Sequence, residues 1–336
     1  MRLHRLGERG LIRRIRRTIG SPTPGVRVGI GDDAAVLELT PGAYLLATTD
    51  LVIEDVHFRR RAAGPADIGW KAMAVNLSDI AAMGGTPLFA LVALACPEKT
   101  DVEEVDRFYE GLADAARPHG VRIVGGDTST SPAGWIANVT LLGEMTGRPR
   151  LRSDARAGDR IAVLGDLGRS AAGLAALEAE ARPPLPDEVL ADVTRAHLRP
   201  VARVAEGKWL GVADGVHAMI DLSDGLATDL GHVACESGVA ARVELARLPV
   251  APSTRAVAGA LGLDPLELAA TGGEDYELLF TAEAGPMGDL AAGLASATGA
   301  PVTVIGEITA GDTGVTFLDA AGRVVELGSG FEHFRG

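Results

Sequence analysis

Hydrophobic and polar positions divide the first half of the chain into helical and extended segments. Residues 3–20 and 102–116 have the pattern of amphipathic helices, and residues 70–85 (WKAMAVNLSDIAAMGG) carry apolar side chains on most faces of a helix that ends in two glycines. Short apolar runs predict strands at 26–30, 34–39, 43–49, 88–95, 121–124 and 136–144. Strands that alternate with helices indicate mixed α/β layers with one face of a sheet covered.

The pattern changes near residues 146–159, where glycine, proline and arginine replace the apolar periodicity. We therefore expect two domains, residues 1–147 and 148–336. In the second, residues 160–164 and 218–220 predict strands that lead into the turns GDLGRS and DLSDG, each followed by a helix. Asp221 and Asp224 could cap the helix after DLSDG. After the segment GGEDYELLF, the tail as far as Phe331 predicts alternating strands and turns.

Composition agrees with a globular protein and limits its partners. Of the 336 residues, 47% are hydrophobic and 23% are charged, which is ample material for packed cores. The net charge of -13 argues against general binding to nucleic acid or to an anionic membrane. Two widely separated cysteines suggest neither disulfides nor a thiolate metal site, so we expect a reducing cytoplasm. We find no signal peptide pattern and no long apolar span.

The few lysines exclude one common way of binding phosphate. No lysine follows a glycine-rich loop in the spacing GxxxxGK[ST], so the chain has no Walker-type phosphate loop. The turn GDLGRS could hold a phosphate at a helix N-terminus, but close packing of strand, turn and helix explains its glycines equally well. We favour the packing explanation.

Asp79 lies inside the apolar helix of residues 70–85, where an unpaired carboxylate would be costly. It could be satisfied by backbone N–H groups with Asn76 as a neutral neighbour. However, several other apolar runs also end in Asp beside Gly, Ser or Thr, and so many carboxylates are most easily explained by shared cations. These further acidic positions are Asp32 and Asp33, Asp50, Asp127, Asp221, and Asp224.

An oxygen-rich acidic set of this kind suits Mg²⁺ and phosphate chemistry. Several Mg²⁺ ions around a triphosphate would offset the repulsion between carboxylates, and phosphoryl transfer depends mainly on positioning and charge neutralisation. Paired carboxylates could instead hydrolyse glycosides. The aromatic content of 4% is low for a cleft that stacks on sugars.

Several long motifs occur in order along nearly the whole chain: GIGDDAAVL, TTDLVIEDVHF, WKAMAVNLSDIAAMGGTPLFALVAL, VGGDTS, HLRPVARV, MIDLSDGLATDL and TGGEDYELLF. Together they resemble the thiamine-monophosphate kinase family of the aminoimidazole ribonucleotide synthetase-like ATP-binding superfamily. The resemblance implies ATP-dependent phosphorylation of thiamine monophosphate to thiamine diphosphate by direct in-line transfer, with several Mg²⁺ ions. It also implies an α/β (α+β) fold of two domains. The N-terminal domain would bind ATP and Mg²⁺ and form a barrel with its partner in a homodimer, and the C-terminal domain would be an α/β sandwich.

Matching the motifs residue by residue implies a site with three parts. Asp79 and Asp224 would be the catalytic carboxylates. The metal ligands would be Asp32, Thr48, Thr49, Asp50, Asp79, Asp127, Asp221 and Asp224. The nucleotide would be bound by Tyr109, Gly126, Asp127, Arg152 and Ser223. Thiamine monophosphate would be bound by His57, Glu274 and Phe331, although His57 could also be an ordinary structural histidine.

Two departures from the family pattern and two alternatives remain. Asp55 stands where family members usually have Gly, and GERGLIRRI lacks an aromatic residue often found there. Other superfamily members would carry a reactive Cys and Lys near the start or a Cys at the end, and this chain has neither. The alternatives are a regulatory module that holds Mg-ATP without turnover, or another small-molecule kinase or synthetase of the superfamily.

Overall fold

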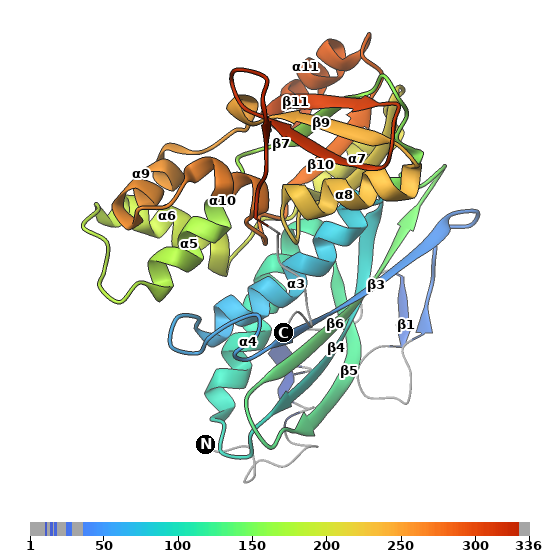
Figure 1. The fold of residues 1–336 in the computed structure, drawn as a ribbon. Helices are drawn as coiled ribbons and strands as arrows, with labels where there is room; N and C mark the ends of the chain where they lie inside the picture. The colour runs from blue at the N-terminus through green and yellow to red at the C-terminus, as the bar shows by residue number, and fades with distance from the viewer. Residues whose placement is uncertain (1–10, 12–13, 16, 19–24, 29–35, 329–336) are drawn as a thin grey trace. The chain divides into compact units, whose positions relative to one another are not determined.

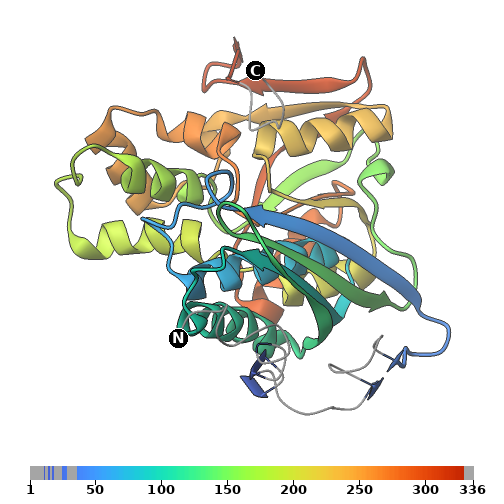
Figure 2. The same ribbon diagram turned by 90° about the horizontal axis from the view of Figure 1, so that it is seen from below.

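The computed structural model describes residues 11, 14–15, 17–18, 25–28 and 36–328. The chain divides into two compact units. The first comprises Met1–Ile80 and Gly85–Gly147, and the second comprises Ala81–Gly84 and Arg148–Gly336. Figures 1 and 2 show the elements of each unit from two directions. Both units combine helices with a β-sheet, as the α/β expectation requires.

The first unit is built on a four-stranded sheet in the order β3-β6-β4-β5 within the described residues. Neighbouring strands are antiparallel except for β4 and β5, which are parallel. The short strands β1 and β2 form a separate pair. The bounds are β1 Val26–Val28, β2 Val36–Leu37, β3 Tyr44–Ile53, β4 Thr86–Cys96, β5 Arg122–Thr130 and β6 Ile136–Met145.

Two helices cover the same face of this sheet, α3 (Pro65–Ala82) and α4 (Val102–Ala116) (Figure 1). Each helix has a glycine where the two backbones meet. A Cβ on Gly69 would lie 1.9 Å from the Phe108 carbonyl oxygen, and a Cβ on Gly111 would lie 1.9 Å from the Ala66 carbonyl oxygen, so this close approach requires glycine at both positions. The predicted bounds of α4 are confirmed. The predicted start of α3 at residue 70 is wrong, since Pro65 occupies the first turn, where its missing N–H costs nothing.

Strand β3 is longer than predicted and lies at the edge of the sheet. Asp50 was expected where the strand ends, but it lies within β3 and pairs with Val139 of β6. The outer part of β3 exposes large apolar side chains, with Tyr44 62% and Leu45 53% exposed. Within the described residues, β3 therefore combines a sheet edge with apolar surface.

The second unit contains a mixed sheet of seven strands in the described residues, in the order β13-β12-β9-β11-β7-β10-β8. Its strands are β7 Arg160–Leu164, β8 Val216–Asp221, β9 Ala240–Glu244, β10 Leu278–Ala282, β11 Val302–Thr309, β12 Gly314–Leu318 and β13 Val324–Val325. Its helices are α5 Arg169–Glu178, α6 Asp187–Leu198, α7 Val204–Val212, α8 Leu226–Ser237, α9 Pro252–Leu261, α10 Pro265–Thr271 and α11 Met287–Thr298. Short 3-10 turns also occur in the described residues: η1 Arg117–His119 in the first unit, and η2 Arg152–Asp154 and η3 Leu245–Arg247 in the second.

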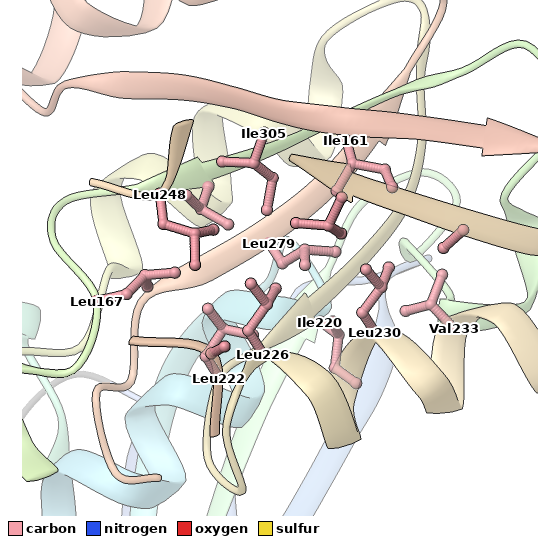
Figure 3. Packing of buried hydrophobic residues seen from close by; sticks show 14 of the residues in the cluster. Ile161, Leu167, Ile220, Leu222, Leu226, Leu230, Val233, Leu248, Leu279 and Ile305 are labelled. Carbon is pink, nitrogen blue, oxygen red and sulfur yellow. The ribbon is translucent and has the colours of Figure 1, made fainter. Parts of the chain in front are cut away.

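The core of this unit lies between the sheet and α8 (Figure 3). Ile161, Ile220 and Leu279 from the central strands pack with Leu226 and Leu230 of α8. Strand β10 is buried along its whole length, so both of its faces are covered. Helices α5, α6 and α9 form a smaller cluster around Val193 and Val257.

Sequence patterns missed several helices of the second unit. The segment after residue 280 was expected to alternate strands and turns, but it contains α11 as well as β11, β12 and β13. No helix among the described residues is long and apolar enough to cross a membrane.

Candidate functional site

Asp79 lies on α3, where its side chain faces β3. The Thr48 hydroxyl, on β3, donates a hydrogen bond to Asp79 Oδ2. Asn76, suggested above as the neutral neighbour, instead donates through Nδ2 to the Ala72 carbonyl oxygen at 3.0 Å, and its buried Oδ1 has no partner. Among the described residues, Asn76 is therefore not the hydrogen-bond partner of Asp79. The structure thus brings together the oxygen-bearing side chains of Thr48 and Asp79 from two different elements.

Thr49 and Asp50 continue the same strand with different exposure. Thr49 is exposed and its hydroxyl lies 3.1 Å from that of Thr140 and 2.9 Å from Asn138 Nδ2, both on β6. Asp50 is half-buried, and its carbonyl oxygen accepts from Asn138 Nδ2 at 3.0 Å. Because side chains alternate along a strand, Thr48 and Asp50 point to one face and Thr49 to the other. The metal set expected from TTD is thus split between two faces of β3.

His57 closes a tight turn after β3. Its Nδ1 accepts a hydrogen bond from the Ile53 N–H at 3.1 Å, and its backbone N–H donates to the Ile53 carbonyl oxygen at 2.9 Å. A neutral imidazole with Nδ1 as acceptor carries its proton on Nε2. Asp55, which replaces the usual Gly, adopts φ 65°. This left-handed conformation is the one glycine favours, and Asp tolerates it better than most residues.

Gly126, Asp127 and Tyr109 have unequal access to solvent. Asp127 is exposed, and its Oδ1 accepts from the Thr128 N–H at 2.9 Å. A Cβ on Gly126 would lie 1.9 Å from the Val92 carbonyl oxygen, so strand packing alone requires glycine there. Tyr109 is only 3% exposed, with its ring edge-on to Phe108, and burial raises the pKa of its hydroxyl well above the usual range. Any contact from Tyr109 to a nucleotide would be limited to this small exposed part.

In the second unit, β8 ends at Asp221 and the following loop gathers acidic side chains. Asp221 is buried, and Ser223 and Asp224 are half-buried. The expectation that one of the two carboxylates is the N-cap residue of α8 is wrong, because that residue is Gly225 at φ 102°. A Cβ there would lie 2.7 Å from the Thr271 carbonyl oxygen, which excludes a side chain.

Asp229, in the first turn of α8, was not identified from the sequence. It is 2% exposed, and its Oδ2 accepts from the Asp224 N–H at 3.1 Å. Burial, followed by the charges of Asp221 and Asp224, raises the pKa of Asp229 to about 8. Its signal was available, since Asp229 is an acidic residue inside an apolar helical segment, as Asp79 is.

The turn GDLGRS does not offer its helix N-terminus to a phosphate. Asp275 accepts from the Gly168 N–H at 2.6 Å and from the Ser170 N–H at 3.1 Å, so an internal carboxylate already occupies the start of α5. A Cβ on Gly168 would lie 2.7 Å from the Ala269 nitrogen, and one on Gly165 would lie 2.2 Å from Glu277. The packing explanation is confirmed.

The remaining predicted residues lie in different settings. Glu274 is half-buried at φ 65° in the loop that precedes β10. Arg152 is exposed in the 3-10 turn η2, Arg152–Asp154, and its carbonyl oxygen accepts from Ser237. Asp32 and Phe331 lie outside the described residues.

The residues present match Mg²⁺ in their chemistry. Within the described ranges, no three His, Cys, Asp or Glu side chains form a group that could hold a metal ion. The candidate ligands are nevertheless all oxygen donors, which Mg²⁺ prefers. Burial raises the pKa of Asp229, and the charges of Asp221 and Asp224 raise it further. A cation held by Asp221 and Asp224 would offset this charge.

Comparison with known proteins identifies relatives of the whole chain. The family AIR synthase related protein, N-terminal domain, matches residues 31–145, and its C-terminal domain matches residues 156–319. The chain is 38% identical to thiamine-monophosphate kinase of Escherichia coli strain K12 over 334 residues, which is 98% of each chain. A solved thiamine-monophosphate kinase from Stenotrophomonas maltophilia K279a superposes with a TM-score of 0.82 and 36% identity, covering 94% of this chain and 96% of that one.

A further solved structure, described as AaThiL complexed with AMPPCP and TMP, has a TM-score of 0.75 and 37% identity over 99% of both chains. Similarity at this level extends through both units, so the two-domain fold expected from the motifs is confirmed. The chain belongs to the thiamine-monophosphate kinase family of AIR synthase related proteins.

Proposed function

We propose that this chain transfers the γ-phosphate of ATP to thiamine monophosphate and releases thiamine diphosphate and ADP. The observation that carries the proposal is the 37% identity, over 99% of both chains, to a relative bound to AMPPCP, an ATP analogue, and TMP. Both the donor and the acceptor motifs of that family occur in this chain. No other enzyme class has comparable support from the residues.

Mg²⁺ is part of this proposal. The proposed Mg²⁺ ligands are Asp32, Asp50, Asp79, Asp127, Asp221 and Asp224, together with Thr48 and Thr49. When bound, Mg²⁺ would neutralise the charge of the ATP phosphates and stabilise ADP as the leaving group. The hydrogen bond from Thr48 holds the Asp79 carboxylate in a fixed orientation, and Asp229 does the same for the Asp224 backbone. Asp79 and Asp224 are the proposed catalytic carboxylates.

The nucleotide and the acceptor use different side chains. The residues proposed to bind ATP are Gly126, Asp127, Arg152, Ser223 and the exposed part of Tyr109. His57 presents an N–H at Nε2, because Nδ1 is already an acceptor, and this proton suits a phosphate oxygen of thiamine monophosphate. The Glu274 carboxylate suits the cationic thiazolium ring, and Phe331 is proposed to stack on it.

An N-terminal domain of residues 1–147 is proposed to bind ATP and Mg²⁺ and to form a homodimer, and residues 148–336 are proposed to form the C-terminal domain. Strand β3 supports the dimer, because an edge strand with exposed Tyr44, Leu45 and Leu51 offers backbone and apolar surface to a second sheet. Cys96 and Cys235 are both free thiols, which supports a reducing cytoplasm.

The test is an assay of the purified chain with ATP, Mg²⁺ and thiamine monophosphate, in which thiamine diphosphate and ADP are measured together. We expect the two products in equal amounts, and none when a chelator removes Mg²⁺. Binding of ATP without any diphosphate would instead favour the regulatory module. Turnover of ATP with a different phosphate acceptor would favour another kinase of the superfamily.

A further inference from the structure

The loop of residues 272–277, here called the acceptor loop, has an unusual backbone. Glu274 adopts φ 65° and Tyr276 adopts φ 51°, both in the left-handed region. This conformation is strained for residues other than glycine, and it persists only where surrounding contacts hold it. The acceptor loop must therefore be held from outside.

The backbone of the acceptor loop is fixed to the loop that follows β8. The Glu274 N–H donates to the Ser223 carbonyl oxygen at 2.7 Å, and the Tyr276 N–H donates to the Leu222 carbonyl oxygen at 2.9 Å. In return, the Leu222 N–H donates to the Glu277 carbonyl oxygen at 2.9 Å. These bonds fix the main chain of Glu274 but leave the direction of its carboxylate undetermined.

A buried histidine reaches that carboxylate from another element. His197, in the last turn of α6, is 6% exposed, and its Nδ1 lies 3.2 Å from Glu274 Oε2. The same Nδ1 lies 3.0 Å from the hydroxyl of Ser170, which is 1% exposed. A carboxylate only accepts hydrogen bonds, so His197 donates to Glu274 in the tautomer that carries its proton on Nδ1. The geometry places this ring nitrogen within reach of the Glu274 carboxylate.

A second histidine and carboxylate pair in the same unit shows what a purely structural pair looks like. His217 Nδ1 lies 2.9 Å from Asp159, whose side chain is only 4% exposed and also accepts from the Thr281 hydroxyl and the Arg156 N–H. The Asp159 carboxylate is therefore enclosed by donors. Glu274 differs, because its side chain lies near His197 and yet keeps 25% exposure. Part of the Glu274 side chain is therefore accessible from outside.

We propose that His197 is a positioning residue that orients the Glu274 carboxylate toward the cationic acceptor, an inference that rests on the proposed function. The histidine does not contact the reacting phosphate. It fixes the rotamer of a flexible glutamate, so that binding the acceptor costs less side-chain entropy. Its removal weakens acceptor binding and leaves ATP binding and phosphate transfer nearly unchanged.

The experiment compares three single variants. His197→Leu removes the donor, and His197→Asn keeps an N–H near the place of Nδ1. His217→Asn, at the structural pair, is the matched control for loss of a buried histidine. We expect His197→Leu to raise KM for thiamine monophosphate about tenfold, with KM for ATP and kcat changed less than about twofold. His197→Asn should recover most of the affinity, and His217→Asn should leave both KM values unchanged.

A double variant tests whether His197 acts through Glu274. In the Glu274→Ala background, His197→Leu should add less than about twofold to KM for thiamine monophosphate, because the carboxylate it orients is gone. An equal rise in both backgrounds overturns the proposal, as does an unchanged KM in His197→Leu. If the wild-type chain forms no thiamine diphosphate at all, the proposed function fails instead.

A measurement on the wild-type chain that needs no turnover tests this inference independently of the proposed function. It also does not depend on whether the His197 variants fold. The imidazole N–H signal of His197 in the full wild-type chain, seen by ¹⁵N NMR, should show the proton on Nδ1. It should shift in Glu274→Ala, while the His217 signal stays in place. A His197 ring protonated only on Nε2 contradicts the proposed hydrogen bond directly.

Discussion

Replacement of Asp229 by asparagine should change how the stability of the chain depends on pH. Asp229 is buried beside Asp221 and Asp224, and its pKa rises from 3.8 to about 8 in the folded protein. A folded pKa above the unfolded value means that the neutral form is favoured by folding. The stability it contributes is complete below about pH 4 and is lost as the pH rises through about 8.

The size of the effect follows from the two pKa values. At about pH 5 the folded value lies about three units above the pH, and each unit is worth about 1.4 kcal/mol, so Asp229 contributes roughly 4 kcal/mol there. At about pH 9 this contribution is close to zero. The asparagine of the variant has no carboxyl proton to lose, and its Oδ1 can still accept from the Asp224 N–H. The difference in unfolding free energy between wild type and Asp229→Asn should therefore fall by about 4 kcal/mol from about pH 5 to about pH 9.

Urea unfolding of both proteins at pH 5, 7 and 9, in buffer with a metal chelator, measures this difference. Asp312→Asn, at an exposed carboxylate in the loop between β11 and β12, is the control for the loss of one negative charge. Excess Mg²⁺ should flatten the Asp229 profile, since a cation bound by Asp221 and Asp224 offsets their repulsion. A constant difference between wild type and Asp229→Asn in chelator would refute the reasoning.

Three further predictions concern the first unit. Asp79→Asn should lower kcat at least about a hundredfold with an unchanged circular dichroism spectrum, because it removes charge without volume, and turnover near the wild-type rate would contradict the assigned role. Asp55→Gly should change the unfolding free energy by no more than about 1 kcal/mol. Asp55→Val should destabilise the chain more strongly, because a β-branched residue strongly disfavours φ 65°. Thermal unfolding of the two variants measures the difference. Leu45→Asp should convert the proposed homodimer to a monomer in light scattering, and a persistent dimer would exclude β3 as the interface.

Local patterns predicted the elements whose signals lie within the segment itself. The bounds of α4 followed from its one-sided apolar pattern, and β4 and β6 followed from continuous apolar runs. The start of α3 was missed because Pro65 to Gly69 carry little apolar periodicity. Helices α9 and α11 were missed because their alanine and glycine residues give weak patterns, and their packing in the second unit decides their structure.

For the candidate site, motif spacing identified the acidic positions but not the groups that hold them. Thr48 reaches Asp79 only because β3 and α3 pack together, and Asp229 reaches the Asp224 N–H only because α8 begins at Gly225. The partners of Glu274 are farther away in sequence, with His197 on α6 and Ser170 on α5. No periodicity within one segment carries such information.

The sequence by itself determined the family, the two-part organisation of its motifs and the oxygen-donor chemistry of the acidic residues. These depend on residue type and order, which the chain states directly. Only the tertiary structure decided that Asp275 occupies the start of α5, that Gly126 is required by the Val92 carbonyl oxygen, and that His197 faces Glu274. The physical reason is that burial, hydrogen-bond partners and close backbone contacts arise between segments distant in sequence, and packing fixes their distances.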